Sequence, residues 1–399
     1  MPLQTGTGLI IAYKKEVAFG TLPANDAAAK QLRRVGFNLG LKKDLIRSAE
    51  IRRDYQRPAA RHGMRKVDGS IGGELSLGSY ADFIGSALRR NFTAVVVAGQ
   101  PLTNVTASVA APNFVRAAGS WITDGLRVGM TMRWAGWTTT GVANNAKNFT
   151  IIALTATGIT VAEAVVAKAS GDSVTASVPG KVTYTPGTGH TDDSYAFESW
   201  APSAAQSLRF LGNKVAGFDI DMPPNDKVSI DIAFMGQNRV KDVSQYFAAA
   251  TAAGTSQMQT GLSGALYLNG VAYGILTAFK LSATGSPEMQ PVVGSNLTPD
   301  VFQGPVDVSG SFSVLWQSGV IDDHFDLEQE VPLVVTLRDT TAAASEFMTL
   351  TLPYIKLGGG DQADSERAII QSFDFTARVG DGANGYEATT LMVHDSLAP

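Results

Sequence analysis

Few residues in this chain are of the types that carry out catalysis or bind metals. The 399 residues include no cysteine and four histidines, which lie far apart: His62, His190, His324 and His394. The lack of cysteine excludes a disulfide scaffold, a thiolate metal site and a cysteine nucleophile. A histidine metal site or catalytic triad would require folding to bring distant histidines together.

Acidic residues are the other candidates for chemistry. Asp219 and Asp221 alternate with apolar residues, which predicts that both lie on the polar face of one strand. A cluster of acids could offer oxygen ligands to Ca²⁺ but lacks the spacing and the glycine of a calcium loop, so we interpret it as a solvated helix face. Its members are Asp322, Asp323, Asp326, Glu328 and Glu330.

Sequence motifs for nucleotide binding or hydrolysis are absent. The chain has no P-loop, no GxGxxG opening a helix, no HExxH and no GxSxG. The run Gly358–Asp361 is not followed by a helix start with Lys or Ser, so we predict a flexible loop there rather than a phosphate site. We therefore expect no enzymatic activity, no metal and no cofactor.

Charge is distributed unevenly along the chain. The net charge is −4, yet residues 30–66 hold twelve Lys/Arg against three acids, and residues 300–399 hold sixteen acids against four bases. The basic segment is compatible with a nucleic-acid footprint, with a basic surface that meets an acidic surface of a neighbouring subunit, or with a solvated loop. We favour the second interpretation, because few aromatic residues accompany the basic ones.

Short strands dominate the predicted elements. Period-two alternation between turn signals predicts strands at 35–41, 67–77, 215–222 and 227–235. Helical patterns are few. They predict helices at 79–90, where Ser79 to Asp82 resembles a capping box, and near 319–330, with a weaker one near 242–253. No run of about 18 apolar residues and no signal peptide is seen, so we expect a soluble chain made in a reducing cytoplasm.

The chain has the pattern of a tandem duplication. A V-x-G-S motif, a strand and a helix with an aspartate recur with the same spacing, from Gly69 to Asp82 and from Gly310 to Asp323. Upstream, residues 34–39 match 276–281. Downstream, 215–220 match 370–375, and the closing strands 229–235 and 387–393 correspond. This common order predicts two copies of one β-module with a flanking helix.

An insertion distinguishes the first copy from the second. Residues 97–185 occupy the place of a short loop in the second copy, and they contain Trp121, Trp134 and Trp137. These tryptophans are enough to fill a small core, so we predict a compact all-β domain grown from a surface loop and facing outward. Its expected strands are 113–116, 129–135, 148–154, 157–162 and 172–178.

Several segments resemble bacteriophage tail tube proteins. The resemblance lies in residues 13–21, 46–51, 61–63 and 67–71, continues through 211–218 and 233–236, and includes the insert at 114–121, 125–129 and 148–155. It covers essentially the whole chain. It implies a mainly β fold of two tandem antiparallel sandwich or barrel modules, each with a flanking α-helix, plus the inserted domain. The expected domains are 1–96 with 186–254, the insert 97–185, and 255–399.

The resemblance also implies a structural function in the virion. Such proteins form stacked rings, and the tube carries the genome to the host. Two modules in each chain favour trimeric rings with pseudo-sixfold symmetry over hexameric ones. Implied partners are further copies of the chain, other tail proteins (tape measure, terminator and distal tail proteins), and viral DNA that passes without specific binding. The protein would belong to the virion tail and be assembled in the cytoplasm of the bacterial host.

The candidate interface residues lie in the basic arm at 42–66. We expect them to contact neighbouring subunits or rings: Arg47, Arg52, Arg53, Asp54, Arg57 and Arg61. A surface adhesin that binds carbohydrate through the insert's tryptophans is an alternative from another class, and a tail terminator or capsid decoration protein is a nearer one. A hydrolase is the least favoured alternative.

Overall fold

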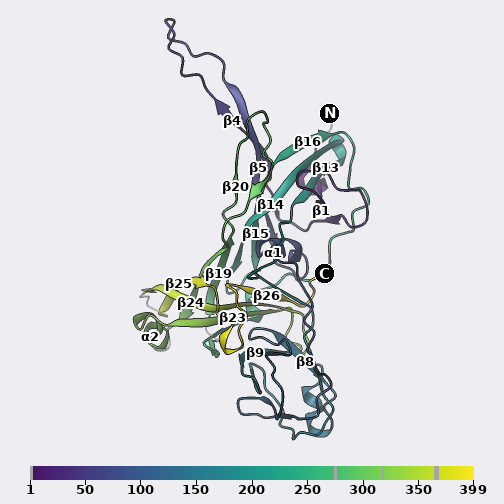
Figure 1. The fold of residues 1–399 in the computed structure, drawn as a ribbon, viewed down its shortest axis with the longest axis vertical. Helices are drawn as coiled ribbons and strands as arrows, with labels where there is room; N and C mark the ends of the chain where they lie inside the picture. Colours follow the sequence, from purple (N-terminus) through teal and green to yellow (C-terminus); the bar gives the residue numbers. More distant parts are fainter. Residues whose placement is uncertain (1–2, 274–275, 317–318, 364–367) are drawn as a thin grey trace.

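The computed structural model describes residues 3–273, 276–316, 319–363 and 368–399, and these form a mainly β protein (Figure 1). The predicted fold class is confirmed. Within the described residues the α-helices are α1 (Ala81–Ala87) and α2 (Val320–Asp326), as the sequence predicts. The capping box is not formed, because Asp82 accepts hydrogen bonds from Tyr13 and Lys30 instead. Short 3-10 turns lie at Gly6–Gly8, Thr139–Asn144, Pro202–Ala204, Gly261–Ser263 and Ala383–Gly385.

One continuous antiparallel sheet, here called the wall, runs through both copies of the repeat. Its strands pair side by side in the order β4 (Gly40–Ile46), β5 (Arg61–Glu74), β15 (Ser229–Gly236), β14 (Gln206–Met222), β19 (Leu276–Thr284), β22 (Asp307–Leu315), β25 (Ile370–Arg378) and β24 (Phe347–Ala363). The short β3 (Gly36–Phe37) extends β4 along β5.

Alternation along the wall strands separates a buried face from an exposed one. In β15 and β25 almost every second residue is buried. The buried positions join one apolar core that includes Phe218, Ile232, Phe312 and Phe373. Polar residues occupy the opposite face, as period-two strands with one wet side require.

A second layer of strands covers the buried face. In the first repeat it contains β1 (Ile10–Lys15), β2 (Lys30–Gln31), β13 (Tyr195–Ala201) and β16 (Asn238–Asp242). In the second repeat it contains β17 (Gly264–Leu268), β18 (Val271–Tyr273), β23 (Glu330–Arg338) and β26 (Met392–Asp395), together with β12 (Lys181–Tyr184). A two-stranded ribbon, β20 (Glu288–Met289) and β21 (Val301–Phe302), follows β19.

The two repeats have corresponding strand pairings. Phe234 pairs with Gly69 in the first repeat, and Phe375 pairs with Gly310 in the second. An added Cβ on Gly69 would lie 2.0 Å from the Asn38 carbonyl oxygen, and one on Gly310 would lie 2.2 Å from the Lys280 carbonyl oxygen. Both positions therefore require glycine for the same close approach of backbones.

The downstream strand matches expected from the sequence are wrong. In the wall β5 is followed by β15 and then β14, while β22 is followed by β25 and then β24. The counterpart of residues 370–375 is therefore β15 and not 215–220, and β14 corresponds to β24. Residues 387–391 are not a strand; β26 begins at Met392. Alternating Phe-Asp patterns occur on several wall strands, so the pattern alone does not identify the partner.

The inserted segment builds its own sheet. Its strands pair in the order β11 (Thr175–Ser177), β8 (Thr131–Ala135), β9 (Phe149–Leu154), β10 (Gly158–Val161), β7 (Phe114–Arg116) and β6 (Val105–Ala107). Its core packs against Tyr267, Val334 and Met392 of the second repeat's covering layer. The insert therefore docks on the second repeat, although it interrupts the first.

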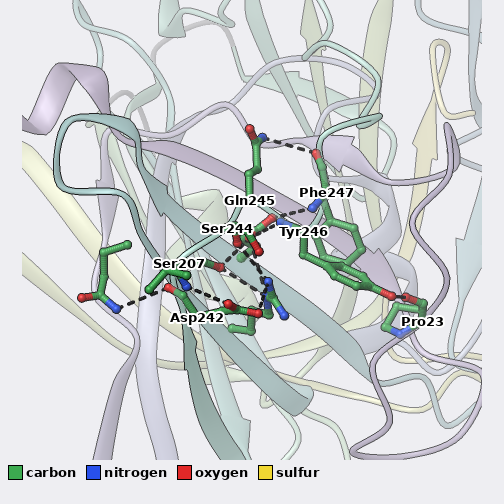
Figure 2. A network of polar contacts seen from close by, with 11 residues as sticks. Pro23, Ser207, Asp242, Ser244, Gln245, Tyr246 and Phe247 are labelled. Carbon is green, nitrogen blue, oxygen red and sulfur yellow. Dashed lines mark hydrogen bonds and ion pairs between the residues drawn. The ribbon is translucent and has the colours of Figure 1, made fainter.

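The predicted helix at 242–253 is not present, and a buried carboxylate explains why (Figure 2). Glu198 is 1% exposed and accepts hydrogen bonds from the backbone amides of Tyr246 and Phe247, each at 2.6 Å, and from the Ser207 hydroxyl at 2.5 Å. Arg209 donates to the Ser244 carbonyl at 2.9 Å and pairs with Asp242 at 2.8 Å. These contacts take up backbone groups that a helix would need.

Candidate functional site

The wall ends in two strand edges that have no partner strand within the described residues. At one end β4 pairs with β5 on its inner side only. At the other end β24 pairs with β23 as far as Lys356, after which residues 357–363 pair with β25 alone. A strand with unpaired N–H and C=O groups is a template for pairing with another chain. These two edges are the strongest candidates for a functional surface.

The run Gly358–Asp361, predicted to be a flexible loop, forms part of this second edge. It lies in β24, where the register shifts between Leu357 and Gly359. An added Cβ on Gly360 would lie 2.4 Å from the Phe373 ring. The glycines therefore provide a bulge and space for an aromatic side chain, rather than flexibility.

The hairpin of β4 and β5 projects far from the body of the molecule, at the end opposite the insert (Figure 1). Its two strands are joined by residues 47–60, and the predicted interface residues Arg47, Arg52, Arg53, Asp54, Arg57 and Arg61 are all exposed. Apolar side chains are exposed beside them, with Ile51 99% and Tyr55 100% accessible. The hairpin thus presents both charge and apolar area to solvent.

Most charges of the hairpin are not neutralised within the described part of the chain. Lys42 pairs with Asp68 at 2.6 Å, and Arg52 pairs with Asp54 at 2.7 Å. This hydrogen-bonded pair raises the pKa of Arg52 and lowers that of Asp54. No acid of the second repeat pairs with the arm in the described residues of the single chain.

The exposed face of the wall is concave and acidic. A depression of about 550 Å³ lies over β14, β19, β22 and β25 and is lined by Asp219, Asp221, Asp374 and Lys280, together with serines of the central strands. Lys280 lies 3.4 Å from Asp221. The aspartates predicted on a polar strand face are found there, and Asp219 stands directly opposite Asp231 on β15.

The two helices differ in how they are covered. Helix α1 is buried except at Asp82, whose carboxylate lies 2.9 Å from the Tyr13 hydroxyl and 2.6 Å from the Lys30 amine. Burial and this carboxylate raise the pKa of Tyr13. Helix α2 buries only Ile321 and leaves Phe325 41% exposed. The acids expected on a solvated helix face lie on or just beyond α2.

The candidates for metal binding and catalysis are not brought together. Within the described ranges no group of three or more His, Asp or Glu side chains is placed to hold a metal ion, and no helix there has the length and apolar character needed to span a membrane. His394 is fully buried, accepts from the Thr131 amide at 3.2 Å and contacts the Pro179 carbonyl at 2.7 Å. It therefore fastens the insert to β26.

The insert's tryptophans form its core rather than a ligand platform. Trp121, Trp134 and Trp137 are 0%, 1% and 2% exposed. The Trp134 ring lies 5.1 Å from Phe114 and 5.6 Å from Trp137. Rings packed against one another in this way are not available to stack on a sugar.

Comparison with known proteins gives one clear finding. A family model described as phage tail tube protein matches residues 6–377, which is nearly the whole chain. A search of curated proteins gives no match.

Proposed function

Because the chain belongs to the phage tail tube protein family, a structural family of the virion tail, we propose that it assembles into rings by joining the free edges of the wall. The observation that carries this proposal is the continuous wall, in which the strand at each end has an outer edge without a partner among the described residues. Closure of such a sheet with other copies leaves no edge unsatisfied, because every strand then has two neighbours. Contacts that are heterologous and rotate closed give a ring.

A ring of three chains fits the two repeats in each chain best. Two repeats in each chain would give six similar segments around the ring, whereas a hexamer would give twelve. The chain's three proposed parts are 1–96 with 186–254, the insert 97–185, and 255–399. The last strand of the insert's range, β12, pairs with β26 in the covering layer and so links the insert to the second repeat. The insert docks on the covering layer, on the side of the wall away from its concave face. We place it on the outside of the tube.

The concave face of the wall would line the lumen. Its carboxylates give the lining a negative charge, with Lys280 as a basic residue among them. DNA would be repelled by such a surface and would slide without specific binding, because only lining charges within a Debye length of about 8–10 Å act on it.

The β4–β5 hairpin is the proposed contact between stacked rings or adjacent subunits. Its arginines and exposed apolar residues extend beyond the wall in the direction of the strands. Rings stacked through it would form a tube for genome delivery. Tape measure, terminator and distal tail proteins would be its other partners, and assembly would take place in the host cytoplasm.

Electron microscopy of the purified chain tests this function. We expect rings or hollow tubes, with a threefold repeat of the insert around each ring. A solitary monomer at high concentration would contradict the proposal. It would favour the adhesin, a terminator or a decoration protein, and binding to a glycan array would separate the adhesin from the other two.

A further inference from the structure

The chain contains one junction between repeats that can be read residue by residue. Strand β14 of the first repeat pairs with β19 of the second, with Gly217 opposite Thr284, Asp219 opposite Ser282 and so on to Met222 opposite Phe279. The Gly285 amide donates to the Ala216 carbonyl at 2.8 Å and extends the pairing by one step. Joining of one repeat to the next thus has a defined register within the chain.

The bulge in each repeat fixes which residues are equivalent. The β14–β15 pairing skips Ala216, and the β24–β25 pairing skips Gly358, at the same place relative to the aromatic residues Phe234 and Phe375. Counting from the bulge, Gly217 corresponds to Gly359 and Asp219 to Asp361. The same bulge in both copies supports this alignment, since bulges are specific features of a fold.

The other side of the junction is aligned in the same way. Phe37 lies opposite Ile71 in the first repeat, and Phe279 lies opposite Phe312 in the second. Counting along the strands, Gly40 corresponds to Ser282 and Leu41 to Ala283. The outer edges of 38–42 and of 357–363 are the ones left without a partner strand in the described residues.

We propose that residues 359–363 of one chain pair antiparallel with residues 38–42 of a second copy, with Gly359 opposite Lys42 and Asp361 opposite Gly40. This inference rests on the proposed ring. It specifies the seam, which is the strand pairing that joins β24 of one chain to β4 of the next. The seam between chains then repeats the β14–β19 junction inside the chain, so all repeats around the ring have similar neighbours. A slip by one residue would turn the acidic face of the following strands away from the lumen.

The internal junction also predicts which seam position requires glycine. An added Cβ on Gly217 would lie 2.5 Å from the Ala283 carbonyl oxygen, whereas one on Gly359 meets nothing within 4 Å in the single chain. In the proposed seam Gly359 faces the Leu41 carbonyl of the second copy. Gly359→Ser should therefore leave the folded monomer intact and abolish or strongly reduce ring formation.

Gly40→Ser is the matched control. It is the same substitution on the opposite strand of the seam, at a position whose equivalent, Ser282, already carries this side chain. We expect rings from Gly40→Ser as from the native chain. Normal rings from Gly359→Ser would overturn the proposed register.

Cysteine cross-linking tests the pairing directly, because the native chain has no cysteine. Residues 219 and 282 form a non-hydrogen-bonded pair, since the hydrogen bond from Gly285 to Ala216 sets the alternation. Side chains are closest in such pairs, at a separation that suits a disulfide. Asp219→Cys with Ser282→Cys should cross-link within one chain. Asp361→Cys with Gly40→Cys should cross-link between chains and give dimers and trimers on a non-reducing gel.

A slipped pair distinguishes failure of the register from failure of the function. Asp361→Cys with Lys42→Cys should cross-link at least several-fold less, because a diagonal pair is about 7–8 Å apart. Rings that cross-link at Lys42 and not at Gly40 would overturn the register and leave the ring intact. Absence of both rings and intermolecular cross-links, with the internal control pair oxidised, would overturn the proposed function and the seam together.

Discussion

Two carboxylates that face each other across the wall are expected to destabilise the folded protein. Asp219 and Asp231 face each other across β14 and β15 and are both exposed. Like charges directly opposite in a sheet are destabilising by about 0.2–1 kcal/mol. We expect Asp231→Asn to raise the free energy of unfolding of the monomer by that amount in urea titrations at low salt.

A neighbouring aspartate supplies the control for this prediction. Asp374 lies on the same face but stands opposite Ser311 and Gly359. Asp374→Asn should therefore leave stability nearly unchanged, and the difference between the two variants should shrink at high salt. A loss of stability in Asp231→Asn would contradict the interpretation that this pair serves the lumen rather than the fold.

Two adjacent buried groups in β26 titrate with opposite effects on stability. Burial lowers the pKa of His394 from 6.5 to about 4 and raises that of Asp395 from 3.8 to about 6. The His394 contribution is complete above about pH 6.5 and is lost toward pH 4, because the unfolded chain takes up the proton first. Asp395 takes up its proton first in the folded chain, so its contribution rises over about the same range as pH falls.

Removal of one group should expose the effect of the other. In Asp395→Asn the free energy of unfolding should fall more steeply between pH 6.5 and 4 than in the native chain, by about 2–3 kcal/mol over that range. Urea titrations at several pH values would measure it. The substitution also weakens a contact with the Gly78 or Leu397 amide, so the slope with pH is the decisive quantity. If the free energy of unfolding changed with pH in the same way in the native chain and in Asp395→Asn, protonation of Asp395 would not offset the loss of stability caused by protonation of His394.

The sequence predicts whether a side chain is exposed or buried only where polar and apolar residues alternate clearly along a strand. The polar-face placement of Asp219 and Asp221 and the insert's tryptophan core are confirmed. The role of Gly358–Asp361 could not be predicted, because the reason for its glycines is the Phe373 ring on a neighbouring strand. Close approaches between distant segments leave no local signal.

At the scale of elements, Glu198 holds the segment that follows β16. Its carboxylate satisfies the amides of Tyr246 and Phe247 in a buried environment. Glu198→Ala should destabilise the protein by about 3–5 kcal/mol, because it leaves buried amide and hydroxyl donors without their acceptor and removes one of the two carboxylates close to Arg209. Hydrogen exchange should become faster at residues 243–250. Asp242→Asn, at a more exposed partner of Arg209, should cost much less, and equal losses would contradict this assignment.

Local pattern predicted most elements and failed where tertiary contacts decide. The five strands expected in the insert and both helices lie close to their predicted positions, whereas β6 of the insert was not predicted. The helix expected at 242–253 has a suitable apolar pattern, but Glu198 accepts hydrogen bonds from two of the backbone amides that such a helix would use. The equal spacing from Gly69 to Asp82 and from Gly310 to Asp323 indicates the repeat in the sequence. Which strands of the two repeats correspond follows only from their pairing in the sheet.

At the scale of the whole molecule, the β4–β5 hairpin is the element to test for tube growth. Arg52→Glu with Arg53→Glu should block tube formation by reversing charge on the arm, with the protein still folded. The matched control is Lys147→Glu with Lys241→Glu, which makes the same change of charge on the insert and on β16. Tubes of normal length from the arm variant, seen by electron microscopy, would remove the proposed role of the arm.

Charge reversal on the concave face, which we propose lines the lumen, should leave assembly intact and change how DNA interacts with the tube. Asp219→Lys with Asp374→Lys introduces cations on the concave face without altering the wall edges. We expect tubes of normal appearance that bind double-stranded DNA with a strong dependence on salt. Native tubes measured in parallel should show little binding. Unchanged binding in the variant would contradict the assignment of this face to the lumen.

The pairing of β14 with β19 has a consequence for how strongly a ring of three chains would depend on protein concentration. Half of the junctions between repeats in that ring lie within a chain. Their two strands are covalently linked, so these junctions form at a high local concentration that does not depend on the amount of protein present. Only the remaining seams cost translational freedom. The amount of closed ring should then vary with about the third power of protein concentration, where a ring of six single-repeat chains would vary with the sixth. In the proposed ring, a two-repeat chain would therefore close at a lower concentration than a single-repeat chain with seams of the same strength.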